Sequence, residues 1–460
     1  MTQWTTPVWV IADDFTGAND AGSGLARAGA RVNVLFDSAS TPEPSAADVW
    51  VISTDSRALS AQQAAQRTQQ ATEAGAAIVR QGWLFKKIDS TLRGNPGAEI
   101  DAALQASGKA LALVAPAVPK LGRTTIDGYC LIEGRLLTET EFASDPKTPV
   151  SDARVLIRLH EQSALPGTVL TLAEVRSPQL LVMLQRHIQQ GTRLLVADAE
   201  SDDDLQRLMF AATQLEEKPL LAGASGLSEA LGAQLAAGKA ADCAPASSGA
   251  RRVISDTPRS GANTLSRAPQ GKQAATPLLA VVGSMSEIAA LQIARLQAHT
   301  PLTLVDVDIS QLFQQPAWAD HPQWLQQAVS ALHQGQHCVI RTCQQADQRH
   351  QIAALCEQHH VSRQQLGEQI CQQLGRLTAA ILAQATPAAL YLSGGDVAIA
   401  IARQLGAHGF QIHGQVAGCV PYGHLLNAYQ QLLVMTKAGG FGNENTLVEV
   451  IRFIEEKSSE

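Results

Sequence analysis

The chain has 460 residues, 45% of them hydrophobic and 17% charged, and this length exceeds what one hydrophobic core usually serves, so we expect two domains. Its formal charge of −7 supplies no basic field for nucleic acid, and no apolar run approaches the roughly 20 residues of a membrane span. The 7 cysteines are scattered without a two-residue spacing, which disfavours a disulfide framework or a zinc site. The composition therefore predicts a soluble, cytoplasmic protein with reduced thiols and no nucleic-acid or membrane partner.

The first predicted element is a strand at 7–12. Its residues are apolar without alternation, which is typical of a strand buried on both faces of a parallel sheet. The strand runs directly into polar residues, which are Asp13, Asp14, Thr16, Asn19 and Asp20. Because ligands bind at the carboxyl edge of such a sheet, we expect these side chains to offer acceptors for sugar hydroxyls and for a reacting proton. The alternative is that Asp14 or Thr16 only caps a helix that starts near Ala18.

Further strand-like runs in the first half each precede a helix-favouring stretch, and they lie at 32–36, 49–53, 84–88, 111–115, 194–197 and 220–222. This alternation predicts an α/β domain with a mainly parallel sheet.

A second polar group follows the run at 84–88. Arg93 supplies a planar fork that matches a carboxylate, although an ion pair with Asp89 on a helix is the competing interpretation. Lys86 and Lys87 alternate across the strand, so at most one of them faces the cleft. The candidate substrate ligands from this region are Lys87, Asp89, Ser90, Arg93, Gly94 and Asn95, with Arg123 from the loop after the run at 111–115. For Arg123, a surface salt bridge is the alternative.

The composition changes at 244–276 to Ala, Ser, Gly, Pro, Arg and Thr, with no apolar period that could pack. Such a segment is typical of a flexible linker or insertion. We therefore predict one domain at 1–243 and a second at 277–460.

The second domain resumes the alternation, with strand-like runs at 278–282, 302–307, 338–342, 389–393 and 432–436. Three of these runs end in small residues whose backbone amides can approach a phosphate closely. The candidate nucleotide ligands are Ser284, Ser286, Gly394, Gly395, Asp396, Val397, Gly439 and Gly440. Asp396 either holds ribose or Mg²⁺ or caps the following helix. No Walker A motif and no dinucleotide fingerprint is present.

In sequence and in order, these motifs resemble those of the four-carbon acid sugar kinases. The resemblance is carried by Asp-Asp-Phe-Thr-Gly at 13–17, Lys-Lys-Ile-Asp-Ser-Thr-Leu-Arg-Gly-Asn at 86–95, Val-Gly-Ser-Met-Ser at 282–286, Ser-Gly-Gly-Asp at 393–396 and Thr-Lys-Ala-Gly-Gly-Phe-Gly at 436–442. It implies two α/β domains, each a mainly parallel sheet flanked by helices, with the active site in the cleft between them. The first domain would bind a sugar acid. The second would bind ATP with Mg²⁺, through Ser284, the turn at 394–397 and Gly439.

The resemblance also implies an activity. The stretch at 86–94 is closer to the threonate and erythronate branch than to the 3-oxotetronate branch, so we expect ATP-dependent phosphorylation of the terminal 4-hydroxyl of D-threonate. D-erythronate and 3-oxotetronate are the alternative substrates. Asp14 is the expected proton acceptor, Asp13 orients the loop or contacts metal, and Arg93 anchors the substrate carboxylate.

Two other classes compete with a kinase. A non-catalytic sensor of sugar acid and nucleotide would not consume ATP in response to the acid, and an oxidoreductase would bind a nicotinamide. The metal ligands and a homodimer are left open.

Overall fold

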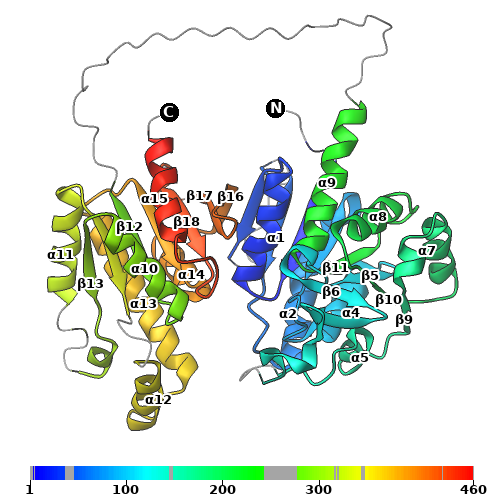
Figure 1. Ribbon diagram of the computed structural model, residues 1–460, viewed down its shortest axis with the longest axis horizontal. Helices are drawn as coiled ribbons and strands as arrows, with labels where there is room; N and C mark the ends of the chain where they lie inside the picture. Colours follow the sequence, from blue (N-terminus) through cyan, green and yellow to red (C-terminus); the bar gives the residue numbers. More distant parts are fainter. Residues whose placement is uncertain are drawn as a thin grey trace, which may run out of the picture.

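The computed structural model describes residues 4, 6–36, 46–144, 149–242, 277–314, 318, 321–342, 348–426 and 428–458. The predicted linker at 244–276 lies outside these residues, as do Cys243 and Cys343. The described residues form two lobes, with helix α1 and strands β16 and β17 between them (Figure 1).

The first lobe is a parallel sheet flanked by helices, in the order β2-β3-β1-β4-β11-β5-β10-β9. The prediction that β1 is buried on both faces is confirmed, because Val8 and Val10 belong to one apolar cluster whereas Trp9 and Ile11 belong to another. The strands are β1 (Val8–Ala12), β2 (Val32–Leu35), β3 (Val49–Ser53), β4 (Trp83–Lys87), β5 (Ala112–Ala115), β9 (Gly167–Leu170), β10 (Leu194–Ala197) and β11 (Leu220–Gly223). The helices are α1 (Phe15–Arg27), α2 (Ala61–Ala74), α3 (Ala76–Gln81), α4 (Pro96–Ser107), α5 (Val155–His160), α6 (Leu172–Val175), α7 (Leu180–Gln189), α8 (Asp202–Thr213) and α9 (Ser225–Asp242).

Two features of this lobe escaped the sequence analysis. The helical stretch at 61–81 is broken at Gly75, where an added Cβ would lie 2.3 Å from the buried ring of Trp9. A small antiparallel sheet also follows β5, formed by β6 (Arg123–Ile126), β7 (Tyr129–Ile132) and β8 (Arg135–Leu136). Short 3₁₀ helices flank it at η1 (Pro119–Leu121), η2 (Leu137–Glu139) and η3 (Glu141–Ser144).

The second lobe has a parallel sheet in the order β13-β14-β12-β15-β18, which continues into antiparallel β17 and β16. Its strands are β12 (Leu278–Val282), β13 (Leu302–Asp306), β14 (His337–Arg341), β15 (Ala389–Ser393), β16 (Gly409–Val416), β17 (Val420–Leu426) and β18 (Leu433–Lys437). Its helices are η4 (Ile309–Phe313), α10 (Glu287–His299), α11 (His321–His333), α12 (Gln348–Gln358), α13 (Arg363–Leu382), α14 (Gly395–Gln404) and α15 (Thr446–Lys457). A mainly parallel α/β sheet in each half is therefore confirmed.

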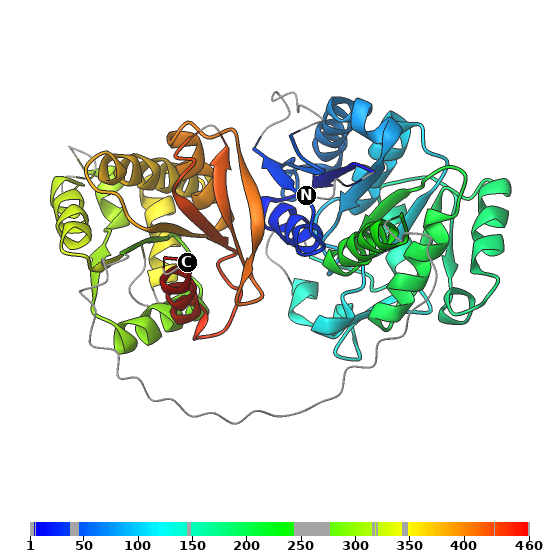
Figure 2. The same ribbon diagram turned by 90° about the horizontal axis from the view of Figure 1, so that it is seen from above.

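The two sheets join edge to edge, which the sequence analysis did not predict. β16 pairs antiparallel with β2, so that within the described residues a single sheet of 15 strands crosses both lobes (Figure 2). Gly409 permits this approach, because an added Cβ would lie 2.4 Å from the backbone oxygen of Val34. β16 was missed because the predicted strands were unbroken apolar runs, whereas in β16 polar Gln411, His413 and Gln415 alternate with apolar residues. This alternation is the pattern of a strand with one face partly open to solvent.

Helix α1 belongs to the first lobe but also contacts the second. It packs against β16 and against α14. The Asn19 amide donates to Thr436 Oγ1 across the two lobes at 3.1 Å. The carboxyl ends of β1, β3 and β4 thus lie on one side of this contact, and those of β15 and β18 lie on the other.

Candidate active site

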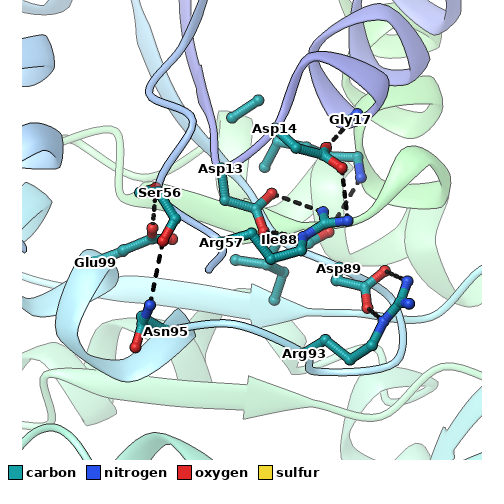
Figure 3. Close-up of polar contacts among 12 residues, drawn as sticks. Asp13, Asp14, Gly17, Ser56, Arg57, Ile88, Asp89, Arg93, Asn95 and Glu99 are labelled. Atoms are coloured by element: carbon teal, nitrogen blue, oxygen red, sulfur yellow. Dashed lines mark hydrogen bonds and ion pairs between the residues drawn. The ribbon is translucent and has the colours of Figure 1, made fainter. Parts of the chain in front are cut away.

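Charged side chains converge at the carboxyl ends of three neighbouring strands in the first lobe. Asp13 and Asp14 follow β1, Arg57 follows β3, and Asp89 follows β4 (Figure 3). The sequence analysis placed Asp89 in a separate polar group, but it meets Asp13 and Asp14 because parallel strands end at one edge of a sheet. Arg57 was missed, although its position just after a buried strand that neighbours β1 was a usable signal.

Arg57 connects the two aspartates. Its Nε and Nη2 donate to the two oxygens of Asp13 at 2.6 and 2.9 Å, and its Nη1 lies 2.6 Å from Asp14 Oδ2. The Asp13 carboxylate is buried, whereas the Asp14 side chain is 24% exposed. A two-point guanidinium contact of this kind fixes both the position and the charge of Asp13.

The surroundings of Asp13 and Asp14 shift the pKa values of the two carboxyl groups in opposite directions. Burial opposes the charge of Asp13, but Arg57 outweighs it and holds the pKa of Asp13 below its ordinary value. Burial and the adjacent Asp13 charge raise the pKa of Asp14. Asp13 is therefore the permanent anion of the pair, and Asp14 is the group that can take up a proton.

Asp14 also caps helix α1. Its Oδ1 accepts the Gly17 amide at 2.6 Å, as the alternative interpretation of this residue predicted. The cap and the Arg57 contact use different oxygens of the carboxylate, and each oxygen keeps a further lone pair. Capping thus does not exclude a second role for Asp14.

Arg93 and Asp89 form the ion pair that the sequence analysis left open. Arg93 Nε donates to Asp89 Oδ2 at 2.6 Å, within an irregular loop before α4 rather than on a helix. Burial opposes the charge of Asp89, but the Arg93 hydrogen bond and the Arg57 charge hold its pKa well below its usual range. Gly94 has a φ of 85°, which favours glycine. The Arg93 side chain is 26% exposed, so the protein does not enclose it completely.

The two lysines of β4 point to different sides, as their alternation predicted. Lys86 is fully buried and lies 2.9 Å from Glu99 Oε2. Lys87 Nζ lies 3.5 Å from Asp20 and donates to the Ile88 carbonyl oxygen at 3.1 Å. Lys87 is therefore on the side of α1 that carries Asp14 and Asp20.

Arg123 and Ser90 come together, because the Arg123 guanidinium donates to Ser90 Oγ. Asn95 does not join them. Its amide donates to the backbone oxygens of Ser56 and Leu59, the latter at 2.9 Å. Asn95 thus supports the loop after β3 from behind instead of facing the charged group (Figure 3).

A buried polar network lies behind Arg57. Ser56 Oγ donates to Glu99 Oε1 at 2.5 Å, and the other oxygen of Glu99 pairs with Lys86. Burial raises the pKa of Glu99, and the charge of Lys86 opposes that shift. The network ties the residue next to Arg57 to helix α4. Sequence reasoning had no signal for Glu99, because its partners come from other elements.

A cavity of about 350 Å³ lies between the lobes. From the first lobe, its lining includes Phe15, Thr16, Asn19 and Asp20 on α1. The charged group around Arg57 and Arg93 lies beside the cavity and is not part of its lining. From the second lobe, it includes Gly394, Gly395, Thr436, Lys437 and Ala438.

The first turns of α1 and α14 face one another in this cavity. A Cβ added at Gly395 would lie 3.5 Å from Thr16 Oγ1. Asn19 is 6% exposed, and its Oδ1 has no hydrogen-bond partner among the described residues. The cavity thus combines two helix N-termini with an unused acceptor.

The loops predicted to bind nucleotide come together in the second lobe. Ser286 Oγ donates to the Gly439 carbonyl oxygen at 2.8 Å, and Ser284 Oγ donates to Ser286 Oγ at 3.0 Å. Gly394 has a φ of 114°, and its amide donates to the Lys437 carbonyl oxygen at 2.9 Å.

Other predicted nucleotide residues differ in exposure. Val397 is buried and packs toward Gly394, whereas Asp396 is exposed in the first turn of α14. Gly440 is exposed, and nothing lies within 4 Å of a Cβ added there.

Metal clusters and membrane-spanning helices are both absent from the described residues. In the described ranges, His, Cys, Asp and Glu side chains do not gather in threes at any place that could hold a metal ion. Among the helices of the same ranges, none has the length and apolarity to cross a membrane.

Two family models match the chain, one for each lobe. A sugar-binding N-terminal domain matches residues 8–231, and a nucleotide-binding C-terminal domain matches residues 279–447. The chain is 39% identical to a D-threonate kinase of Salmonella typhimurium, over 97% of this chain and 98% of the relative. It is 30% identical to a D-erythronate kinase of Heliobacterium modesticaldum, over 98% of each. A Haemophilus influenzae protein of solved structure has the same fold, with a TM-score of 0.71 and 22% identity over 97% of this chain and 100% of that protein.

Proposed function

The chain belongs to the four-carbon acid sugar kinase family, and on that premise we propose that it transfers the γ-phosphoryl group of ATP to the 4-hydroxyl of D-threonate. The choice of D-threonate rests on the relative with 39% identity over nearly the full length of both chains. The D-erythronate kinase relative, at 30% identity, makes D-erythronate the second candidate.

The observation that carries the proposal is the cavity in which α1 of the sugar-binding half faces α14 of the nucleotide-binding half. Helix N-termini present backbone amides and a positive potential, which favour an anionic group between them. A γ-phosphate held there would have the sugar acid on one side and ADP on the other. Phosphoryl transfer depends mainly on such positioning and charge stabilisation.

Asp14 is the proposed proton acceptor. The 4-hydroxyl oxygen bonds to the γ-phosphorus, the bond from that phosphorus to the β,γ-bridging oxygen breaks, and the hydroxyl proton passes to Asp14. The raised pKa of Asp14 suits this role, because a carboxylate with greater proton affinity is a better base. Asp13 and Arg57 hold the Asp14 carboxylate in place.

The substrate carboxylate is proposed to bind Arg93. Arg93 already holds one carboxylate, that of Asp89, and its side chain is 26% exposed, so a second carboxylate can approach it. Arg123, which donates to Ser90, lies beside the same Phe142 ring as Arg93. The Cζ atom lies 5.9 Å from the ring centroid in Arg123 and 5.2 Å from it in Arg93. Lys87 extends the positive charge toward Asp14. These cations compensate locally for a chain whose formal charge is −7.

ATP is proposed to lie along the turn at 394–397 and the loop at 439–440, whose amides suit phosphates. Mg²⁺ fits the donor set on the first-lobe side of the cavity, because Asp20 lines the cavity with a 43% exposed carboxylate. Mg²⁺ usually takes one or two carboxylates together with phosphate oxygens. When bound, it neutralises charge on the triphosphate.

We predict that Arg93→Ala raises the KM for D-threonate about 50-fold, because a charge-assisted contact contributes about 2 to 3 kcal/mol. The KM for ATP should stay within about twofold of the wild-type value, since Arg93 lies in the other lobe. Arg154→Ala removes an exposed arginine of the same lobe and serves as the matched control. Steady-state kinetics with each substrate varied in turn decides the matter, and a selective rise in the KM for ATP would contradict the assignment.

A coupled ADP-release assay tests the proposed function. D-threonate, L-threonate, D-erythronate, L-erythronate and 3-oxotetronate are compared at equal concentrations. The expected result is that D-threonate gives the highest kcat/KM. A higher kcat/KM with another of the five acids would make that acid the proposed substrate. If the rate of ADP release does not depend on any of the acids, the protein is not a kinase of these acids.

A further inference from the structure

Four carbonyl groups of the loop at 438–443 are turned toward the protein, those of Ala438, Gly439, Phe441 and Asn443. The oxygens of Ala438 and Gly439 accept hydrogen bonds from Lys437 Nζ, each at 2.8 Å, and the oxygen of Phe441 accepts one at 3.0 Å. Gly439 O also accepts from Ser286 Oγ at 2.8 Å. The side chain of Lys437 therefore sits inside the curve of the loop.

Gln292 supports the same loop from helix α10. Its amide nitrogen donates to the carbonyl oxygens of Phe441 and Asn443, at 3.1 and 2.9 Å. Gln292 is 1% exposed and is not part of the cavity lining, so it has no route to a ligand there. We call the group formed by Lys437, Ser286 and Gln292 the carbonyl brace.

The donor capacity of Lys437 is filled by this arrangement. An ammonium group has three N–H donors and no acceptor, and Lys437 makes three bonds to loop carbonyls. It is 3% exposed although it belongs to the lining of the cavity. A phosphate oxygen could gain a hydrogen bond from Lys437 only if a loop carbonyl lost one.

We propose that Lys437 is a positioning residue, which turns the loop carbonyls inward so that the backbone N–H groups at 439–440 are available to the nucleotide, and that it does not itself bind phosphate. The inference rests on the proposed function for the identity of the nucleotide. Lys87 offers a contrast, because it donates a hydrogen bond to Ile88 O and only approaches Asp20 at 3.5 Å, so its ammonium group keeps donor capacity for a ligand.

The central test is ATP titration by calorimetry of the full-length protein, with no sugar acid present. Lys437→Met keeps the length of the side chain but removes its donors, and the Kd for ATP should rise at least about 20-fold. Lys218→Met, a half-buried lysine of the first lobe, is the matched control and should leave the Kd unchanged. Circular dichroism verifies that each variant is folded.

Two further variants separate positioning from direct phosphate binding. Lys437→Arg keeps the positive charge, but a planar guanidinium does not fit three convergent carbonyls, so it should weaken ATP binding as much as Lys437→Met. Gln292→Leu alters the brace outside the cavity and should raise the Kd for ATP about fivefold to tenfold. Wild-type affinity in both variants would overturn the proposal in favour of a direct contact between Lys437 and phosphate.

The pH dependence supplies an independent readout. Burial lowers the pKa of Lys437 to about 8, and the titratable side chain that faces it is the Cys419 thiol, from the turn between β16 and β17. As pH rises through about 8, Nζ loses one of its three N–H donors. The KM for ATP should therefore rise between pH 7 and 9 in the wild type and in Cys419→Ser, but stay flat in Lys437→Met. A flat wild-type profile would contradict the brace.

Different results would contradict the proposed role of the carbonyl brace and the proposed function. If the wild type binds ATP but phosphorylates none of the five acids, the proposed function falls. If the wild type phosphorylates D-threonate and Lys437→Met keeps the wild-type affinity for ATP, the positioning role of Lys437 is wrong but the proposed function stands.

Discussion

Asp14→Asn should lower kcat for D-threonate about 10³-fold while leaving the Kd for ATP within about twofold of the wild-type value. A positioned general base contributes about 10² to 10⁴ in rate, and an amide cannot take up the hydroxyl proton. Asparagine caps helices as well as aspartate does, so the bond to the Gly17 amide, and with it helix α1, is retained. The loss would thus report chemistry rather than folding.

Asp55→Asn is the matched control for this substitution. Asp55 is exposed near the same site, and its φ of 48° is one that asparagine adopts readily. It should keep wild-type kcat. If Asp14→Asn keeps more than a tenth of the wild-type turnover, Asp14 is not the base.

The pH dependence of wild-type activity should reflect the ionisation of Asp14. Its carboxyl must be ionised to accept a proton, and burial together with Asp13 raises its pKa above the ordinary 3.8. Activity should therefore fall as pH decreases, with a midpoint above 3.8. In Arg57→Met the midpoint should move to still higher pH, because the cation that favours the charged form of Asp14 is gone.

Arg57→Met should have the largest effect on stability, about 3 kcal/mol, together with a loss of about 10²-fold in kcat. Removing one partner of a buried ion pair leaves the other charge uncompensated, and the Asp13 side chain is only 3% exposed. Because the pKa of Asp13 is lowered in the folded protein, its stabilising contribution is present above pH 3.8 and is lost as pH falls through the folded value.

Urea unfolding at pH 7 measures this loss against Arg207→Met. Arg207 pairs with Asp203 on the surface of α8, and an exposed helix pair of this kind contributes about 0.3 to 0.5 kcal/mol. Equal loss in the two variants would contradict the account of Arg57. Unchanged kcat in a folded Arg57→Met protein would show that Arg57 supports the fold and not the chemistry.

The sequence was sufficient to predict the strands whose two faces are both buried. β1 and β12 are unbroken apolar runs, and β15 is apolar up to Ser393. The polar or small residues at the carboxyl ends of these strands mark Asp14 and the glycine turns by residue type alone. β16 and β17 were not predicted because partly exposed residues interrupt their buried ones, so neither strand is an unbroken apolar run. The joining of the two lobes into one sheet followed from β16, so it was missed as well.

The site contacts that escaped prediction are those that depend on distant partners. Arg57 lies 44 positions after Asp13, and the Asn19 contact with Thr436 spans 417 positions. Lys437 stood within a recognised motif, but the direction of backbone carbonyls is a property of conformation, which residue types alone do not reveal. For Asn95 the residue type was misleading, since its amide holds backbone oxygens of a neighbouring loop.

The most direct test of the account is a crystal structure with D-threonate and a non-hydrolysable ATP analogue bound together. We expect the 4-hydroxyl to lie about 3 Å from the Asp14 carboxylate, with the substrate carboxylate at Arg93 and the terminal phosphate between the first turns of α1 and α14. D-threonate bound with its 4-hydroxyl away from Asp14, or a triphosphate outside the cavity between the lobes, would contradict it.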